Sequence, residues 1–286
     1  MKSNTRFSIE KMAALESKHP LLFGSTFQSR FRRTLVIVLM ILFTLFTFVW
    51  LDFNPLRIFL GIGKFFHMLS LFFPPNHGGW FNEYLVGLGE TLAMAFLGTL
   101  LGFLFALPLS FIAAKNVNKN KGSRLLMRRF FDFIRGINTL IWALMFVHVV
   151  GLGPFAGIMA IFVSDLATLG KLFSEAIENV DINQIEGTKS TGANGIQIIR
   201  FAYIPQVLPI MLSNALYFFE SNVRSASILG VLGAGGIGLQ LWDRIRVNNW
   251  KEVCFIIIML LVTIAIIDVL SKKLRDMIMA NQEYRP

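Results

Sequence analysis

The sequence predicts an all-α integral membrane protein with six transmembrane helices. Of the 286 residues, 55% are hydrophobic and only 15% are charged, whereas soluble domains usually carry about 25% charged residues. The mean hydropathy is +0.62. Charge-free stretches long enough to cross a hydrocarbon core of about 30 Å alternate with short basic segments. Together these observations favour a helical bundle in a lipid bilayer.

The expected spans follow from the charge-free stretches in chain order. The first, residues 34–51, is about 27 Å long as a helix, and Pro108 bends the second without ending it. A Gly-Leu-Gly-Pro run divides the next stretch into a third span, starting near Phe130, and a fourth that continues past Asp165. The six expected spans are residues 34–51, 91–114, about 130–150, 155 to beyond 165, 201–219 and 253–267.

Two further apolar segments do not fit an ordinary span. Residues 54–73 include Arg57 and Lys64, which suits a helix lying at the outer interface. Residues 225–242 are uncharged up to Trp242 but rich in glycine, and each glycine inside a helix costs up to about 1 kcal/mol relative to alanine. Irregular backbone at membrane depth must be buried or line a cavity. We therefore expect residues 225–242 to form an extracytoplasmic, cavity-lining, re-entrant stretch.

The distribution of positive charge predicts the orientation in the membrane. The net charge is +10, but a nucleic-acid-binding protein would gather its basic residues on one folded face. Here most of the 27 Lys and Arg residues lie between the apolar runs, in a basic leader (1–33), in residues 115–135, in the loop after the fourth span and in the tail (272–286). By the positive-inside rule, we expect a multi-pass protein of the cell membrane with both termini cytoplasmic. The leader shows no cleavable signal, and the first apolar run is expected to be a membrane anchor.

The most informative motif lies in a polar loop between the fourth and fifth spans. Its parts are Glu186-Gly187-Thr188, then Gly192-Ala193, then Ala202-Tyr203-Ile204-Pro205. This spacing resembles the cytoplasmic coupling loop of ABC-importer permeases, although Gly and Thr stand where that family has Ala. The loop is expected to form a short helix that ends at Gly192, because a helix C-terminus favours a left-handed residue. The alternatives are an ordinary polar connector and the competing triplet Glu175-Ala176-Ile177, which has Asp181 where glycine is needed.

Longer runs extend the resemblance to phosphonate-import permeases. These runs are residues 151–157, 171–181, 191–193, 204–209, 224–230 and 233–238, and the similar region covers about residues 86–271. The resemblance implies the type I ABC importer permease fold and a subunit that imports phosphonate or related phosphorus anions such as phosphite and hypophosphite. It divides the chain into the leader (1–33), a first span with an outer interfacial segment (34–85), a permease core (86–271) and a cytoplasmic tail (272–286).

The resemblance also implies partners. They are two cytoplasmic ATPase subunits, which bind ATP and Mg²⁺, and an extracytoplasmic phosphonate-binding protein. This chain itself is expected to need no cofactor. One coupling loop is present per chain, whereas an ATPase pair offers two docking clefts. A second copy of the chain in a two-fold homodimer meets that requirement.

Two sets of residues are expected to carry functional roles, and the first of them follows from the resemblance. ATPase coupling falls on Glu186, Gly187, Thr188, Gly192, Ala193 and Pro205. A translocation path is expected at Arg224, Ser225, Ser227, Gly233, Gly235, Gly236 and Gly238. Arg224 has an alternative role in a helix pair with Glu220, four residues earlier on the same face. The glycines either pack closely or turn peptide N–H groups toward a passing anion, since their G-x-G-x-x-G pattern lacks the strand and the acidic residue of a dinucleotide site.

No pattern typical of an enzyme is found. Gly170-Lys171 is followed by Leu172, so the phosphate-binding P-loop is absent; there is no metal-ligand cluster, and the lone Cys254 cannot form an intrachain disulfide. A competing class is a secondary transporter that titrates Asp165 and His148, but such carriers usually show inverted repeats, and none is found. A membrane scaffold without transport is a third class. Asp165 is expected to face the bundle interior with a structural partner, whereas Glu90 and Asp268 are expected only to mark helix ends.

Overall fold

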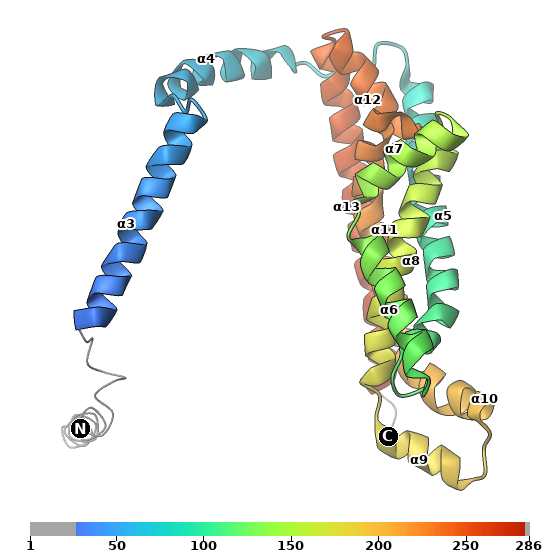
Figure 1. Ribbon diagram of the computed structural model, residues 1–286. Coiled ribbons are helices and arrows are strands. Elements are labelled where there is room, and N and C mark those ends of the chain that lie inside the picture. The colour runs from blue at the N-terminus through green and yellow to red at the C-terminus, as the bar shows by residue number, and fades with distance from the viewer. Residues whose placement is uncertain (1–26, 284–286) are drawn as a thin grey trace, which may run out of the picture. The chain divides into compact units, whose positions relative to one another are not determined.

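The computed structural model describes residues 27–283, and helices dominate this part of the chain (Figure 1). No strand occurs within it, so the predicted all-α class is confirmed. The expected basic leader lies outside the described residues except for 27–33, which begin the first helix. The elements are α3 (Phe27–Trp50), α4 (Pro55–Leu71), α5 (Phe81–Ala113), α6 (Lys121–Arg135), α7 (Thr139–Val150), α8 (Pro154–Glu178), α9 (Ile182–Ser190), α10 (Gly195–Ile198), the π-helical turn η1 (Ile199–Tyr203), α11 (Ile204–Leu229), the π-helical turn η2 (Gly230–Ala234), α12 (Gly236–Arg246) and α13 (Trp250–Glu283).

The chain divides into two units, Met1–His67 and Met68–Pro286. The described part of the first unit consists of α3 and most of α4. The apolar side chains of α3, among them Leu39 and Phe43, are exposed within this unit, and a helix that is apolar on all sides suits a lipid environment. The Asn54 Oδ1 atom accepts the N–H of Leu56 at 2.9 Å and caps α4. The helix expected over residues 54–73 is therefore present.

The second unit is a helical bundle in which α5 and α8 pack closely along their length. Glycines make this approach possible. A Cβ atom on Gly98 would lie 2.6 Å from the Cβ of Ile161, and one on Gly102 would lie 2.7 Å from the Cβ of Asp165. Small residues let neighbouring membrane helices approach at backbone distance. The core therefore runs between α5 and α8, and α11 packs against both of them.

Within residues 27–283, five helical stretches are long and apolar enough to cross a membrane, and α6 with α7 makes a sixth if the bent pair counts as one span. The pair is bent by 84°. The third span was expected to be one continuous helix starting near Phe130, and this is wrong because α6 ends at Arg135 and α7 starts at Thr139. The reason lies in Asn138, whose Oδ1 accepts the N–H of Leu140 at 2.9 Å and so caps a new helix.

The remaining expected spans are present with longer bounds. Residues 34–51 lie in α3 up to Trp50, residues 91–114 lie in α5 up to Ala113, and the fourth span is α8, which contains Asp165. Residues 201–219 lie in η1 and α11, and residues 253–267 lie in α13. Pro108 is inside α5 without ending it, as predicted.

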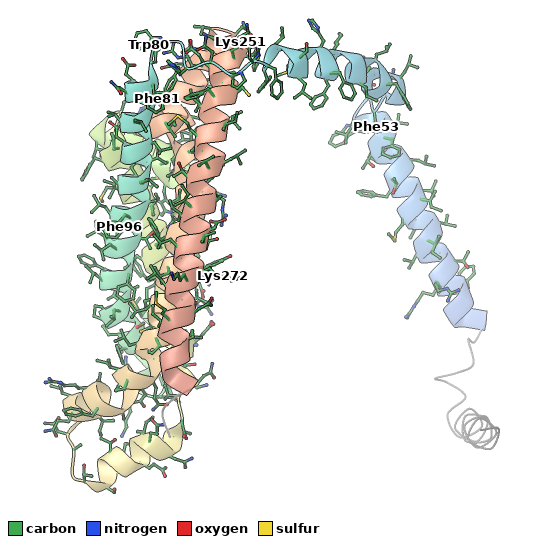
Figure 2. The ribbon with its side chains drawn as sticks, turned by 180° about the vertical axis from the view of Figure 1, so that it is seen from behind. Phe53, Trp80, Phe81, Phe96, Lys251 and Lys272 are labelled. Carbon is green, nitrogen blue, oxygen red and sulfur yellow. The ribbon has the colours of Figure 1, made fainter. Side chains whose placement is uncertain are left out.

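Opposite ends of the second unit carry different surfaces. The α9 and α10 helices lie at one end (Figure 1), whereas Trp80, Phe81 and Lys251 lie at the other (Figure 2). Near Trp80 the guanidinium of Arg244 lies 5.3 Å from the ring centroid, an arrangement that suits a membrane–water interface. The buried carboxylate of Glu252 forms an ion pair with Arg244, whose Nε lies 2.9 Å away, and it accepts a hydrogen bond from the hydroxyl of Tyr84 at 2.6 Å. This cluster therefore joins α5, α12 and α13 at that end.

A buried polar cluster joins the three central helices midway along the bundle. The Asn222 Nδ2 atom on α11 donates to Asp165 Oδ2 on α8 at 2.6 Å and to Thr99 Oγ1 on α5 at 2.8 Å. The Asp165 side chain is buried, with 3% of the residue exposed. Among residues 27–283 no basic side chain forms an ion pair with it. Asp165 therefore faces the bundle interior and has a structural partner, as the sequence predicts.

We expect Asp165→Leu to lower stability by about 1–3 kcal/mol, because a buried amide proton of Asn222 loses its acceptor. Asp165→Asn keeps an acceptor oxygen at the same position and should retain the wild-type stability or exceed it. The midpoint of thermal unfolding in detergent measures both effects. Equal midpoints for the leucine and asparagine variants would show that this hydrogen bond contributes nothing.

Candidate functional site

The predicted coupling motif lies on α9, which projects at one end of the bundle (Figure 1). Asp181 begins this helix, because its Oδ1 accepts the N–H of Asn183 at 2.9 Å. Ile185 is the buried residue of α9 and packs in one apolar cluster with Ala202 and Tyr203. Glu186 is exposed. A single apolar side chain thus seats α9 on the bundle, and the polar side chains face outward.

The helix ends as the motif predicts. Gly192 has a φ of +81°, and its N–H donates to the carbonyl of Lys189 at 3.0 Å. Glycine adopts this left-handed conformation without the steric cost that a Cβ atom brings. After the turn, Asn194 and Gln197 form a reciprocal capping box that starts α10. The predicted short helix terminated by Gly192 is therefore confirmed.

An open hollow of about 750 Å³ lies between α9 and the chain that returns through α10 and η1. Phe201 is part of its lining and is exposed. A concave polar surface with exposed apolar residues suits a docking site for a partner. Four of the predicted coupling residues share this surface, whereas Glu186 and Pro205 do not line it. The lining residues are Gln184, Gly187, Thr188, Thr191, Gly192, Ala193, Gln197, Phe201 and Ala202.

A side-chain bridge links α9 to α11. The backbone N–H of Asp181 donates to Gln206 Oε1 at 2.9 Å, and Gln206 Nε2 donates to the carbonyl of Ala202 at 2.9 Å. Pro205 occupies the first turn of α11, where a missing N–H is tolerated. This bridge therefore connects the start of α9 to the start of α11.

Residues 106–279 match the family described as binding-protein-dependent transport system inner membrane component. The match extends from the last turns of α5 into α13 and includes the whole α9 loop. The chain belongs to this family. It is a permease subunit of an ABC transporter and not an enzyme.

Individual relatives of this permease are similar over most of its length. The phosphite transport system permease protein PtxC of Stutzerimonas stutzeri is 33% identical over 71% of this chain and 73% of its own. A second relative from that organism is 35% identical over 86% of each chain. The phosphate-import permease protein PhnE of Mycolicibacterium smegmatis is 31% identical over 80% of this chain and 43% of its own length.

Solved structures of transporters share the fold of this permease. The inward-facing MetNI methionine ABC transporter contains a chain with a TM-score of 0.60 and 21% identity, which covers 68% of this permease and 95% of that chain. A bacterial ABC transporter for the acidic polysaccharide alginate gives a TM-score of 0.59 at 14% identity and covers 87% of this permease and 97% of that chain. The predicted type I ABC importer permease fold is thereby confirmed.

The polar residues predicted for the translocation path lie near the end of α11. Arg224 donates to Glu220 at 2.9 Å and also lies 3.3 Å from Asp268 on α13, so the alternative pairing with Glu220 is present. The Oγ of Ser225 donates to the carbonyl of Ser221, and that of Ser227 to the carbonyl of Arg224. Both serine hydroxyls thus bond to their own helix.

The glycine-rich segment forms a tight connection and a helix. The prediction of irregular backbone over residues 225–242 holds only for the short stretch 230–235, because α11 continues to Leu229 and α12 starts at Gly236. Positive φ values of +95° at Gly233 and +78° at Gly235 interrupt the helix between α11 and α12. Gly238 meets the Ser227 carbonyl at backbone distance. These glycines therefore provide turns and close packing between α11 and α12.

Two peptide N–H groups of this segment have acceptors within the protein. The N–H of Gly236 donates to Glu90 Oε2 at 2.9 Å, and that of Ile237 donates to Thr91 Oγ1 at 3.0 Å. A carboxylate at a helix N-terminus is favoured by the helix dipole. In this conformation both groups are thus engaged with α5.

Sequence reasoning missed the roles of Glu90 and Asp268. Both were expected to mark helix ends, but Glu90 lies inside α5 and caps α12, and Asp268 lies inside α13 beside Arg224. The sequence signal that could have found them is an acidic residue inside an apolar span, because such a residue requires a partner. This signal indicates that a partner exists but not which residue it is.

Proposed function

We propose that this permease imports phosphorus oxyanions, namely phosphonates, phosphite or related reduced anions such as hypophosphite. The proposal is supported by the relatives, which are named for phosphite transport and for phosphate import. The residue runs in 171–181, 204–209 and 224–238 resemble phosphonate-import permeases and support the same class. An extracytoplasmic phosphonate-binding protein supplies the choice among these anions.

The proposed complex contains two copies of this permease and two cytoplasmic ATPase subunits. ATP and Mg²⁺ are bound by the ATPases, and both permease termini lie in the cytoplasm. The support is the single α9 helix per chain, which in a two-fold dimer provides one docking element for each ATPase. The hollow bordered by Gly187, Thr188, Gly192 and Ala193 is the proposed ATPase contact.

The proposed mechanism is alternating access driven by the ATPase cycle. ATP binding closes the ATPase pair and draws the two α9 helices together, and hydrolysis releases them. The Asp181–Gln206–Ala202 bridge passes this displacement to α11. The proposed path follows Arg224, Ser225, Ser227 and the glycines at 233, 235, 236 and 238. Reversing a population from 1:99 to 99:1 requires about 5.5 kcal/mol, which the ATP cycle can supply.

The function is tested by reconstituting the permease in liposomes with candidate ATPase and binding-protein partners. We expect ATP-dependent accumulation of a phosphonate or phosphite, and stimulation of ATP turnover by the loaded binding protein. Phosphate and sulfate serve as comparison anions. Uptake that survives ATP depletion but collapses with the proton gradient would instead assign a secondary transporter.

We expect Glu186→Lys to leave the permease folded and inserted but to reduce ATP-coupled uptake at least tenfold. The reason is that Glu186 is exposed on α9, where a reversed charge disturbs a docked partner but not the bundle. The matched control is Glu175→Lys, which alters the competing triplet at another exposed site. Uptake should fall with Glu186→Lys on α9 and stay normal with Glu175→Lys. The reverse result would refute the proposed coupling site.

A further inference from the structure

One face of α11 carries polar side chains at helical spacing. Exposed residues occur at Ile210, Tyr217, Arg224 and Ile228, and steps of seven and four residues place them on one side of the helix. Polar residues lie between them on the same side. We call this face the α11 stripe, and its polar members are Ser213, Asn214, Tyr217, Ser221, Arg224 and Ser225.

The α11 stripe lies on a helix that is long enough to span the membrane, yet its polarity does not suit lipid. Asn214 is partly exposed, and its amide has no hydrogen-bonding partner among residues 27–283. In hydrocarbon an unsatisfied amide costs several kcal/mol. Polar and charged side chains in membrane helices accordingly face protein or a water-filled cavity. The stripe therefore requires an aqueous or protein environment.

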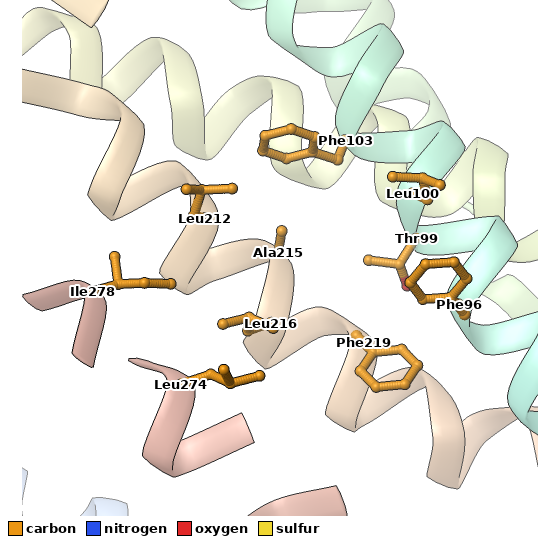
Figure 3. A pocket seen from close by; sticks show the side chains of 10 residues that line it. All are labelled: Phe96, Thr99, Leu100, Phe103, Leu212, Ala215, Leu216, Phe219, Leu274 and Ile278. Carbon is orange, nitrogen blue, oxygen red and sulfur yellow. The ribbon is translucent and has the colours of Figure 1, made fainter. Parts of the chain in front are cut away.

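The opposite side of α11 has the reverse character. An apolar groove of about 470 Å³ lies between α5, α11 and α13 (Figure 3). Phe96, Leu212, Leu216 and Leu274 line it, and such a lining is compatible with acyl chains. The two faces of α11 thus separate a lipid-compatible groove from a polar surface.

Arg224 is held unequally by its two carboxylate partners. Glu220 accepts from Arg224 Nη2 at 2.9 Å and from Arg275 at 3.0 Å, and its side chain is only 12% exposed. Asp268 lies 3.3 and 3.5 Å from Arg224 Nη1, longer than the 2.7–2.9 Å usual for such charged pairs. The side chains of Arg224 and Asp268 are 44% and 39% exposed. Glu220 is therefore the firm partner and Asp268 the loose, accessible one.

We propose that Asp268 is a displaceable counter-ion that governs an anion transit site at Arg224. An oxyanion moving along the α11 stripe replaces Asp268 on the guanidinium, while Glu220 and Arg275 hold Arg224 in place. The guanidinium fork matches the geometry of phosphate-like oxygens. Asp268 returns when the anion leaves, so that binding stays weak enough for passage, as conduction requires. This inference rests on the proposed import of phosphorus anions.

The access of water to the α11 stripe is tested without measuring transport. In a Cys254→Ala background, Ser221→Cys places a thiol one helical turn from Arg224 on the stripe, and Leu216→Cys places one in the apolar groove. The assembled complex in liposomes is treated with a membrane-impermeant, negatively charged thiosulfonate reagent. Because the thiolate reacts only where water reaches it, we expect rapid reaction at position 221 and none at 216. Equal reaction at both positions, or none at 221, overturns the aqueous stripe.

The counter-ion is tested by adding Asp268→Asn to the Ser221→Cys protein. Loss of one negative charge close to Arg224 should raise the reaction rate of the anionic reagent about tenfold, and sodium phosphite should slow it by competition. Asp276→Asn is the matched control, because Asp276 is exposed on the same helix and should change the rate less than about twofold. An unchanged rate with Asp268→Asn refutes the counter-ion.

Uptake by the same complexes separates this inference from the proposed function. With the binding protein saturated, Arg224→Gln should lower phosphite or phosphonate uptake at least tenfold, and Asp268→Asn should lower it severalfold because the anion leaves Arg224 slowly. If the wild-type complex moves no phosphorus anion, the proposed function fails. If it does, and Asp268→Asn and Asp276→Asn transport equally well, only the counter-ion inference fails.

Discussion

Gly192→Val is expected to abolish ATP-coupled uptake while the permease stays folded and inserted. Gly192 has a φ of +81°, and a Cβ atom there would meet no atom within 4 Å. The penalty therefore comes from the left-handed backbone, which costs an L-residue about 1–2 kcal/mol and a β-branched residue more. The turn after α9 must then change its direction, and the α9 hollow loses its shape. ATP turnover and uptake in the reconstituted complex measure the uncoupling.

A graded series sharpens this test. Asn tolerates the left-handed region better than Ala or Val, so uptake should fall in the order Gly192→Asn, Gly192→Ala, Gly192→Val. Gly195→Ala is the control, because Gly195 is also free of neighbours within 4 Å but has no positive φ. It should transport like the wild type. Equal uptake across the whole series would mean that the turn conformation does not matter for coupling.

Gly238→Ala is expected to destabilise the fold strongly. A Cβ atom at this position would lie 1.9 Å from the carbonyl oxygen of Ser227. The clash is with backbone, so no side-chain rotation relieves it, and α12 must move away from α11. Overpacking of this kind costs about 1–3 kcal/mol and sometimes more. The yield of monodisperse protein and its unfolding midpoint in detergent should both fall sharply.

The matched control for this variant is Gly89→Ala on α5. Nothing lies within 4 Å of a Cβ atom there, and alanine is favoured over glycine in a helix by up to about 1 kcal/mol. The control should equal or exceed the wild type in stability. A wild-type midpoint for Gly238→Ala would show that α11 and α12 separate at no cost.

The features that the sequence predicts well are those with local physical causes. Charge-free length predicts α5, α8, α11 and α13, because lipid requires it along the whole span. The end of α9 follows from Gly192, since one residue carries the left-handed turn. The hydrogen bond between Gln206 and Asp181 could not be predicted in this way, because the two residues are 25 positions apart in the chain.

The features that sequence reasoning misses depend on partners far apart in the chain. Glu90 bonds to Gly236 across 146 residues, and Asp268 meets Arg224 across 44. Hydropathy reports only that an acid sits in an apolar run, not which helix turns toward it. The break at Asn138 is different, because a helix cap was readable locally but was outweighed by the apolar length around it.

The π-helical turn η1 has a geometric consequence for the start of α11. A π-turn holds about one residue more than an α-turn. Conversion of η1 to regular α-helix would therefore advance the following chain by one register step, a rotation of about 100° and a rise of about 1.5 Å. Such a rotation of α11 would move Arg224 away from Asp268. The proposed coupling loop thus leads directly into a segment in which a change of helical winding would rotate the helix that follows.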